Sequence, residues 1–316
     1  MLKKVIAVCG PTASGKTALA IEIAKEFGGE IVSCDSMQIY KHMDIGTAKA
    51  TEIEQKTVKH HMIDFLCPSA RYSVADFVER ARLCIDDITS RGKIPVLAGG
   101  TGLYLDSVLN NIAFDDFGSD PQFRQDMEKL AKNEGNEAVH KLLEEKDSEA
   151  AEKIHPNNIR RVIRALEVCH LTGKTFTQVN EESRREAVYD ALIFGIDTDR
   201  ELLYERINNR VDQMMENGLV GEVEALCKMG IDRSTTAMQA IGYKEILEYF
   251  EGKLNIDETV EKIKQESRRY AKRQLTWFRR NEKINWINLS ETDAMKTIFG
   301  KCGLFLGHTS KQEFLK

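Results

Sequence analysis

Residues 10–17 read Gly10-Pro11-Thr12-Ala13-Ser14-Gly15-Lys16-Thr17 and match the pattern G-x-x-x-x-G-K-[ST]. A short apolar run at 5–9 precedes them, and a segment with helical spacing of apolar residues follows at 17–27. The pattern requires this context, because its backbone amides and the helix N-terminus then face a bound phosphate. Lys16 adds a positive charge, and the Thr17 hydroxyl is placed to bind Mg²⁺. All eight residues, from Gly10 to Thr17, are therefore predicted to bind a diphosphate or triphosphate.

The sequence beyond this stretch alternates between short apolar runs and helical patterns. Apolar runs at 30–34 and 94–98 and an amphipathic segment at 74–91 continue the alternation. Such alternation is typical of an α/β protein, so we expect a P-loop core with a parallel sheet flanked by helices.

The sequence pattern and the composition of the chain change after about residue 115. No strand candidate occurs between 116 and 190, where Glu, Lys and Ala are frequent, whereas strand-like runs return afterwards. We therefore expect a first part of the core at 1–115, an all-helical insertion domain at 116–190, and a continued core with C-terminal basic helices at 191–316.

Composition excludes several classes of protein. The 316 residues are 42% hydrophobic and 30% charged, which is unlike a disordered, collagen-like or coiled-coil chain. No apolar run approaches the roughly 18 residues of a membrane span. The seven cysteines form no C-x-x-C pair, which is typical of reduced thiols in a cytoplasmic protein. We expect a monomer, because nothing in the pattern requires a dimer.

Two residues follow predicted strands and should lie at the carboxyl edge of the sheet, beside the phosphate site. Asp35 follows the second apolar run, and Thr101 follows the run at 94–98. A carboxylate near a diphosphate is unfavourable unless it serves a metal or a proton transfer. The alternatives are that Asp35 caps the next turn and that Thr101 belongs to a glycine turn. An ATP-hydrolysing enzyme would place an acid near Thr101, and Asp64 is the only candidate nearby, which weakens a kinase interpretation.

Basic residues are concentrated in two places. The stretch from 262 to 280 contains eight Lys and Arg residues and a single acidic residue, Glu266. It belongs to a segment, 258–280, whose pattern predicts one helix. With Tyr270 and Trp277 interleaved, this pattern resembles an RNA-contacting surface, although a charged outer helix would share much of it. The second cluster is Arg160, Arg161 and Arg164, where a solvated helix face is equally consistent. Arg206 and Arg210 lie one helical turn apart, and one or both could reach the phosphates as a second cationic clamp; surface salt bridges are the alternative.

Together these residues resemble the bacterial tRNA dimethylallyltransferases, also called tRNA isopentenyltransferases. The matching segments are 10–20, 35–40, 43–49, 60–64, 72–77, 99–104, 155–168, 240–245 and 270–279. Ala50 stands where the family usually has Pro, and Asn158 where it usually has Asp.

The resemblance implies a reaction. A dimethylallyl group passes from dimethylallyl diphosphate to N6 of adenine 37, next to the anticodon, in tRNAs that read codons beginning with U. The P-loop would hold the diphosphate of this donor, with Mg²⁺ on Thr17, and Lys16 and Arg210 would stabilise the leaving diphosphate. Asp35 would be the general base, and Thr101 would lie near the bridging oxygen.

The resemblance also implies a tRNA anticodon stem-loop as partner, gripped by the helical insertion. The residues expected at the RNA are Asp35, Ser36, Met37, Gln38, Thr101, Arg124, Ile159, Arg160, Arg161, Val162, Ile163, Arg164, Gln239, Ala240, Ile241, Gly242, Tyr243, Lys244, Arg273 and Arg279.

Three other functions stay open at this point. A P-loop kinase for a small molecule or nucleotide would leave the basic stretch unexplained. An isopentenyltransferase for free adenylate would not need the helical insertion. A non-catalytic RNA-binding P-loop protein would need neither Asp35 nor Thr101.

Overall fold

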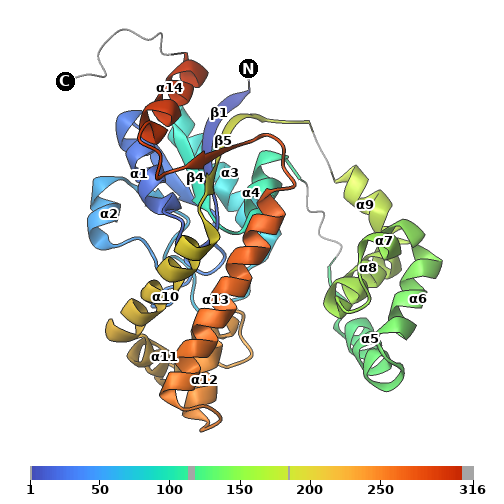
Figure 1. The fold of residues 1–316 in the computed structure, drawn as a ribbon. Helices are drawn as coiled ribbons and strands as arrows, with labels where there is room; N and C mark the ends of the chain where they lie inside the picture. The colour runs from blue at the N-terminus through green and yellow to red at the C-terminus, as the bar shows by residue number, and fades with distance from the viewer. Residues whose placement is uncertain (1, 113–117, 184–185, 308–316) are drawn as a thin grey trace. The chain divides into compact units, whose positions relative to one another are not determined.

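The computed structural model describes residues 2–112, 118–183 and 186–307 (Figure 1). The chain divides into two compact units, Met1–Leu109 with Ala187–Lys316, and Asn110–Glu186. The boundary expected at residue 115 lies outside the described residues.

A six-stranded sheet forms the centre of the first unit. Its strands are β1 (Lys3–Cys9), β2 (Glu30–Ser33), β3 (His60–His61), β4 (Pro95–Gly99), β5 (Tyr189–Asp197) and β6 (Ile284–Asn288). They lie in the order β3-β2-β4-β1-β5-β6, and each neighbouring pair is parallel. The predicted α/β fold with a parallel sheet is confirmed.

Helices cover both faces of this sheet. Successive side chains of a strand point to opposite sides, so a strand such as β1 packs against helices on each face. Val5, Ala7 and Cys9 of β1 pack with α3 (Val74–Ser90) and α4 (Gly102–Leu109). Ile6 and Val8 pack on the other side with α1 (Lys16–Glu26) and α14 (Ala294–Leu306). A short helix, α2 (Glu52–Thr57), precedes β3. Since both faces are buried, the strands read as nearly continuous apolar runs, which is why the sequence reveals them.

A second group of helices in this unit has its own apolar cluster. It consists of α10 (Arg200–Glu216), α11 (Leu219–Lys228), the 3₁₀ helix η1 (Ala237–Gln239), α12 (Tyr243–Phe250) and α13 (Ile256–Phe278). Residues 39–43, which follow β2, pack into this cluster around Tyr243. The long helix α13 runs beside α10 (Figure 1). This packing brings the helix group up to the segment that follows β2.

The second unit is helical in its described part. Its helices are α5 (Pro121–Glu134), α6 (Asn136–Lys146), α7 (Ser148–Lys153), α8 (Ile159–Thr172) and α9 (Phe176–Glu182). Val139, Leu143 and Leu166 belong to its apolar core. This unit therefore has a core of its own.

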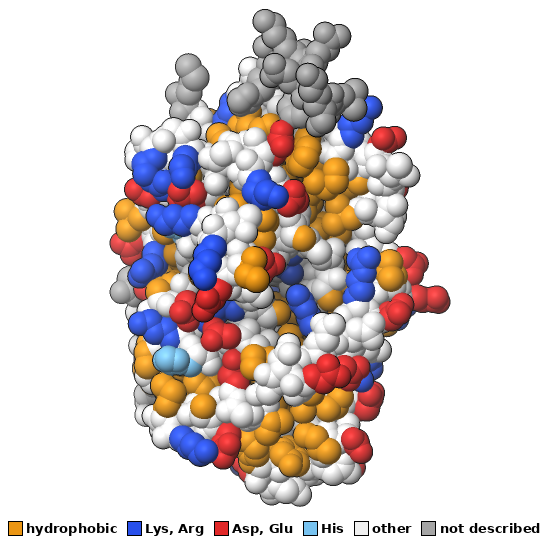
Figure 2. All heavy atoms as spheres, turned by 90° about the vertical axis from the view of Figure 1, so that its left-hand side faces the viewer, with side chains coloured by type: hydrophobic (Ala, Val, Ile, Leu, Met, Phe, Trp, Pro, Cys, Tyr) orange, Lys and Arg blue, Asp and Glu red, His pale blue; other side chains and the backbone are white. Residues whose placement is uncertain are grey.

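On the face drawn in Figure 2, basic, acidic and hydrophobic side chains are interspersed. Although the net charge of the protein is −5, the acidic side chains do not form one continuous patch on this face (Figure 2). Within residues 2–112, 118–183 and 186–307, none of the helices combines the length and the apolar character that crossing a bilayer demands.

Candidate active site

The glycine-rich stretch forms a tight loop between β1 and α1. Ala13 and Gly15 have positive φ angles of 61° and 93°, so the backbone curls before α1 begins at Lys16. The Lys16 ammonium donates to the Pro11 carbonyl over 3.2 Å. Burial and the nearby Arg210 lower the pKa of Lys16 to about 8, against a partial opposing effect of Asp35. A cation whose charge is so poorly compensated favours binding of an anion.

Asp35 lies just beyond β2 and holds the turn that follows it. Its Oδ1 accepts from the backbone N–H of Met37 over 2.8 Å and of Gln38 over 3.3 Å. In the described part of the chain, Oδ2 has no hydrogen-bond partner. Asp35 therefore caps the turn with one oxygen and has the other available for a ligand.

Thr101 follows β4 and faces the same turn. Its Oγ1 accepts from the backbone N–H of Ser36 over 3.2 Å. It also interacts with the hydroxyl of Tyr270, whose pKa is raised to about 12, mainly by burial. The carboxyl ends of β2 and β4 thus bring Asp35 and Thr101 together, as their positions in the sequence predict.

A cavity of about 330 Å³ collects many of the expected site residues. Its lining includes Thr12, Lys16, Thr17, Asp35, Ser36, Met37, Gln38, Arg210, Gln239, Ala240, Ile241, Lys244 and Arg273. Gly10, Pro11, Ala13, Ser14, Gly15, Thr101, Gly242, Tyr243 and Arg279 are not among the lining residues. Thr101 instead contacts this cavity's lining through Ser36.

Arg210 enters the site from α10. Its Nη1 lies 3.4 Å from the Thr12 hydroxyl, and burial lowers the pKa of its guanidinium. Arg206, one turn earlier, is exposed and does not line the cavity. Of the two arginines singled out by spacing, the structure brings Arg210 to the P-loop.

The sequence did not assign a role to the apolar part of this cavity. Ile207, Val211 and Met214 of α10 and Ile263 of α13 line it. Their helical spacing predicts a core face, and spacing does not distinguish a core face from a pocket wall.

The segment that follows Met43 forms another wall, with Gly46, Thr47 and Ala48. The Glu222 carboxylate accepts from the backbone N–H groups of Asp44 and Ile45, each over 2.8 Å, and from the Tyr243 hydroxyl over 2.5 Å. A Cβ on Gly46 would lie only 2.5 Å from the Tyr243 ring, so glycine allows this close packing. Tyr243 therefore supports the wall from behind, where it is fully buried.

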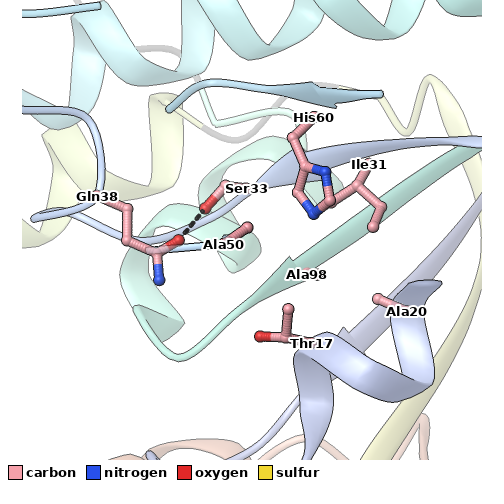
Figure 3. Close-up of a pocket in the computed structure, with 8 residues that line it drawn as sticks. All are labelled: Thr17, Ala20, Ile31, Ser33, Gln38, Ala50, His60 and Ala98. Carbon is pink, nitrogen blue, oxygen red and sulfur yellow. Dashed lines mark hydrogen bonds between the residues drawn. The ribbon is translucent and has the colours of Figure 1, made fainter. Parts of the chain in front are cut away.

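Thr17 also lines a smaller cavity of about 20 Å³. Figure 3 shows Thr17 across from Ser33 and Gln38, which share a hydrogen bond of 3.1 Å. No group of three or more His, Cys, Asp or Glu side chains in the described ranges could hold a metal alone. Mg²⁺ is commonly held by few protein ligands together with phosphate oxygens and water, so Thr17 beside Lys16 fits such an ion.

Asp64, the acid considered for a kinase, has another partner. Its Oδ1 accepts from the buried Lys49 ammonium over 2.9 Å, and Asp44 binds the same ammonium over 2.5 Å. Asp64 does not line either cavity.

The basic stretch on α13 has two parts. In its first half, Lys262 binds Glu248 of α12, and Lys264 binds Asp212 of α10. Arg268 likewise donates to Asn208 of α10 over 2.5 Å. In the second half, Lys272 and Arg273 are exposed. Lys262, Lys264 and Arg268 therefore join α13 to α12 and α10.

In the helical unit, the arginines also divide into two groups. Arg124 and Arg164 bind the fully buried Glu167 at 2.7 and 2.5 Å, whereas Arg160 and Arg161 are exposed. Burial raises the pKa of Glu167, but the bonds from the two arginines outweigh it, so the net shift is downward.

Three expected RNA contacts on α8 are apolar. Val162 and Ile163 are buried in the core of the helical unit, and Ile159 packs against it. The side chains of Val162 and Ile163 are therefore buried, so a contact of these two residues with RNA would have to be made by the backbone. Both lie on the inward face of an amphipathic helix, opposite the exposed arginines.

A family model and two relatives of known name match this chain. Residues 38–281 match a family model described as IPP transferase. The tRNA dimethylallyltransferase of Acetivibrio thermocellus is 52% identical over 306 residues, which cover 96% of this chain and 98% of that protein. One from Bacillus cereus is also 52% identical, over 93% of this chain and 92% of its own length.

Solved structures of the same family of enzymes also resemble this chain. The tRNA isopentenylpyrophosphate transferase of Bacillus halodurans superposes with a TM-score of 0.72 at 43% identity, covering 97% of this chain and 96% of its own. A eukaryotic dimethylallyltransferase acting on tRNA gives a TM-score of 0.81 at 30% identity, covering 98% of this chain and 81% of its own. The resemblance seen in the sequence is confirmed, and the chain belongs to the tRNA dimethylallyltransferase family.

Proposed function

We propose that this protein transfers the dimethylallyl group of dimethylallyl diphosphate to N6 of adenine 37, next to the anticodon, in tRNAs that read codons beginning with U. The observation that carries the proposal is one cavity that combines several basic side chains, a carboxylate and an apolar wall. Lys16 and Arg210 suit a diphosphate, whereas Ile207 and Met214 suit a short hydrocarbon chain. Asp35 supplies a base for the acceptor amine. The substrate implies a cytoplasmic enzyme, and we expect it to act as a monomer.

The reaction is a displacement at C1 of the donor. The N6 lone pair forms the new C–N bond, the C1–O bond breaks, and its electron pair leaves with diphosphate. Negative charge therefore grows on the bridging oxygen, where Lys16, Arg210 and the loop amides stabilise it. Mg²⁺, held by Thr17 and the diphosphate, would neutralise part of the same charge.

The proton of the attacking amine is assigned to Asp35. Its Oδ1 is already used by the turn, so Oδ2 is the atom that accepts the proton. Thr101, held by Ser36, would orient the reacting groups from the next strand.

Adenine 37 is stacked in the anticodon loop, so it must be flipped out to react, which costs a few kcal/mol. We assign the gripping of the anticodon stem-loop to the helical unit through Arg160 and Arg161. Arg124 and Arg164 would contribute through Glu167, which orders the start of α5 and the face of α8.

The test of this function is a transfer assay with radiolabelled dimethylallyl diphosphate, Mg²⁺ and unmodified tRNA, with AMP and ATP as parallel acceptors. Label should enter a tRNA with adenine at position 37 and should not enter the same tRNA with guanine there. Label on free adenylate would instead indicate a cytokinin-type enzyme. ATP binding without any transfer would indicate a kinase.

Lys16 predicts a pH dependence. Since the pKa of Lys16 is about 8 in the free protein, its ammonium loses the proton as the pH rises through that value. A bound diphosphate favours the charged form, so kcat/KM for the donor is expected to fall by about tenfold per pH unit above 8. A pH profile of kcat/KM checks this.

The control is Lys16→Arg, whose guanidinium stays charged over this range. Its profile should be flat where the wild type declines. A wild-type profile that stays level to about pH 9.5, or an equal decline in both proteins, would remove Lys16 as the titrating group.

Substitutions at Arg161 and Arg164 are expected to cause different defects, one in tRNA binding and the other in stability. Arg161→Ala removes an exposed charge and is expected to raise KM for tRNA by roughly fivefold to tenfold without changing KM for the donor. Arg164→Ala leaves buried Glu167 with one cation fewer, so it is expected to lower the stability of the helical unit by about 1–3 kcal/mol. Steady-state kinetics with each substrate varied and thermal unfolding check the pair. A larger effect of Arg161→Ala on donor KM would contradict the assignment.

A further inference from the structure

One side chain joins two backbone segments of the candidate site. Gln274 of α13 is 5% exposed, and both ends of its amide are used. Its Oε1 accepts from the backbone N–H of Thr12 over 2.9 Å, and its Nε2 donates to the carbonyl of Gly100 over 2.9 Å. The amide thus bridges the loop after β1 to the turn after β4.

The two segments hold different parts of the proposed reaction. Thr12 belongs to the diphosphate loop and lies beside Arg210, whereas Gly100 directly precedes Thr101. The sheet sets the positions of β1 and β4, but the loops beyond their ends are tied together by this amide.

Gly100 is shaped to admit the amide. A Cβ at this position would lie 2.1 Å from Nε2 of Gln274. The φ angle of Gly100 is not in the left-handed region, since this glycine is absent from the positive-φ residues of the described chain. Space for Gln274, and not backbone conformation, therefore requires glycine here.

We propose that Gln274 is a positioning residue, which fixes the spacing between the diphosphate loop and the Thr101 turn and thereby aligns donor and acceptor. The inference rests on the proposed transfer reaction. Because alignment matters most at the moment of reaction, a loss of about 1 Å in placement lowers kcat by up to about 100-fold. Donor binding depends chiefly on Lys16, Arg210 and the remaining loop amides, so it should change little.

The first variant is Gln274→Met, which keeps the length of the side chain and removes its hydrogen bonds to Thr12, Gly100 and the Tyr270 hydroxyl. Its kcat is expected to fall by about 10-fold to 100-fold, with KM for the donor within about threefold of wild type. Thr276→Ala is the matched control, because Thr276 is exposed on the same helix and its hydroxyl bonds only to the helix backbone at Lys272. The control should keep wild-type kinetics.

The second variant, Gly100→Ala, tests the same bridge from its other end. The added methyl displaces the amide of Gln274, so the same fall in kcat is expected without any change to Gln274 itself. In the double variant the two losses should not multiply, because the bridge can be broken only once. Thermal unfolding of each variant accompanies the kinetics, to show that the protein is folded.

The outcomes separate this inference from the function on which it rests. An active wild type with a Gln274→Met variant of unchanged kcat would overturn the positioning role alone. Losses that multiply in the double variant would do the same. A wild type that transfers no prenyl group to tRNA would overturn the proposed function first.

Discussion

An Asp35→Asn variant is expected to lose about 10²-fold to 10⁴-fold in kcat while it binds tRNA within a few fold of wild type. The substitution separates the two tasks of this residue. The asparagine oxygen can still accept from the N–H groups of Met37 and Gln38, so the turn after β2 persists. The amide cannot take a proton from N6 of adenine. Single-turnover transfer and a tRNA binding assay measure the two effects.

Asp35→Ala is the companion variant, since it removes the cap as well as the base. It should lose at least as much activity, and it should also unfold at a lower temperature than Asp35→Asn. Equal activity in Asp35→Asn and wild type would reduce Asp35 to a turn residue. An equal loss of transfer and tRNA binding would remove it as the base.

The core of the fold could be predicted from the sequence because its signals are local. The strands of a sheet buried on both faces are short apolar runs, and the P-loop is a contiguous pattern with fixed neighbours. Asp35 and Thr101 could be predicted as site residues for the same reason, since each directly follows a strand. The carboxyl ends of parallel strands meet at one edge without any knowledge of side-chain contacts.

The rest of the site depends on contacts between distant segments. Gln274 lies 262 residues from Thr12, and nothing near it in the chain marks its amide as a bridge. Glu222 is likewise distant from the Asp44 backbone that it binds. The signal that could have pointed to Gln274 is a polar side chain on the inward face of an amphipathic helix, because a buried amide requires partners.

The positions of charged residues in the sequence were the least reliable basis for predicting which residues contact RNA. The basic stretch of α13 looks one-signed when it is read alone, yet Lys262 and Lys264 face acids on neighbouring helices. Arg164 looks equivalent to Arg161, yet it binds buried Glu167. A sequence lists charges without their partners, so it does not separate an arginine that faces solvent from one that closes a buried pair.

Arg210→Met is expected to lower kcat/KM for the donor by about 10²-fold to 10³-fold, the second of the two largest effects. Burial lowers the pKa of this guanidinium, so its charge lacks full solvation until an anion arrives. Its position beside Thr12 places that charge at the diphosphate loop. Because charge on the diphosphate grows as C1–O breaks, the loss should exceed the loss in ground-state donor binding.

Arg206→Met is the matched control, because it removes an arginine from the same face of α10 one turn away, where the side chain is exposed and outside the cavity. Arg210→Lys should recover part of the activity, since it restores the charge without the planar fork. Kinetics with the donor varied and calorimetric titration with inorganic diphosphate measure transition-state and ground-state effects separately. Equal defects in the Arg206 and Arg210 variants would mean that the two act only through general surface charge. Unaltered diphosphate affinity together with unaltered kcat in Arg210→Met would exclude Arg210 from the anion site.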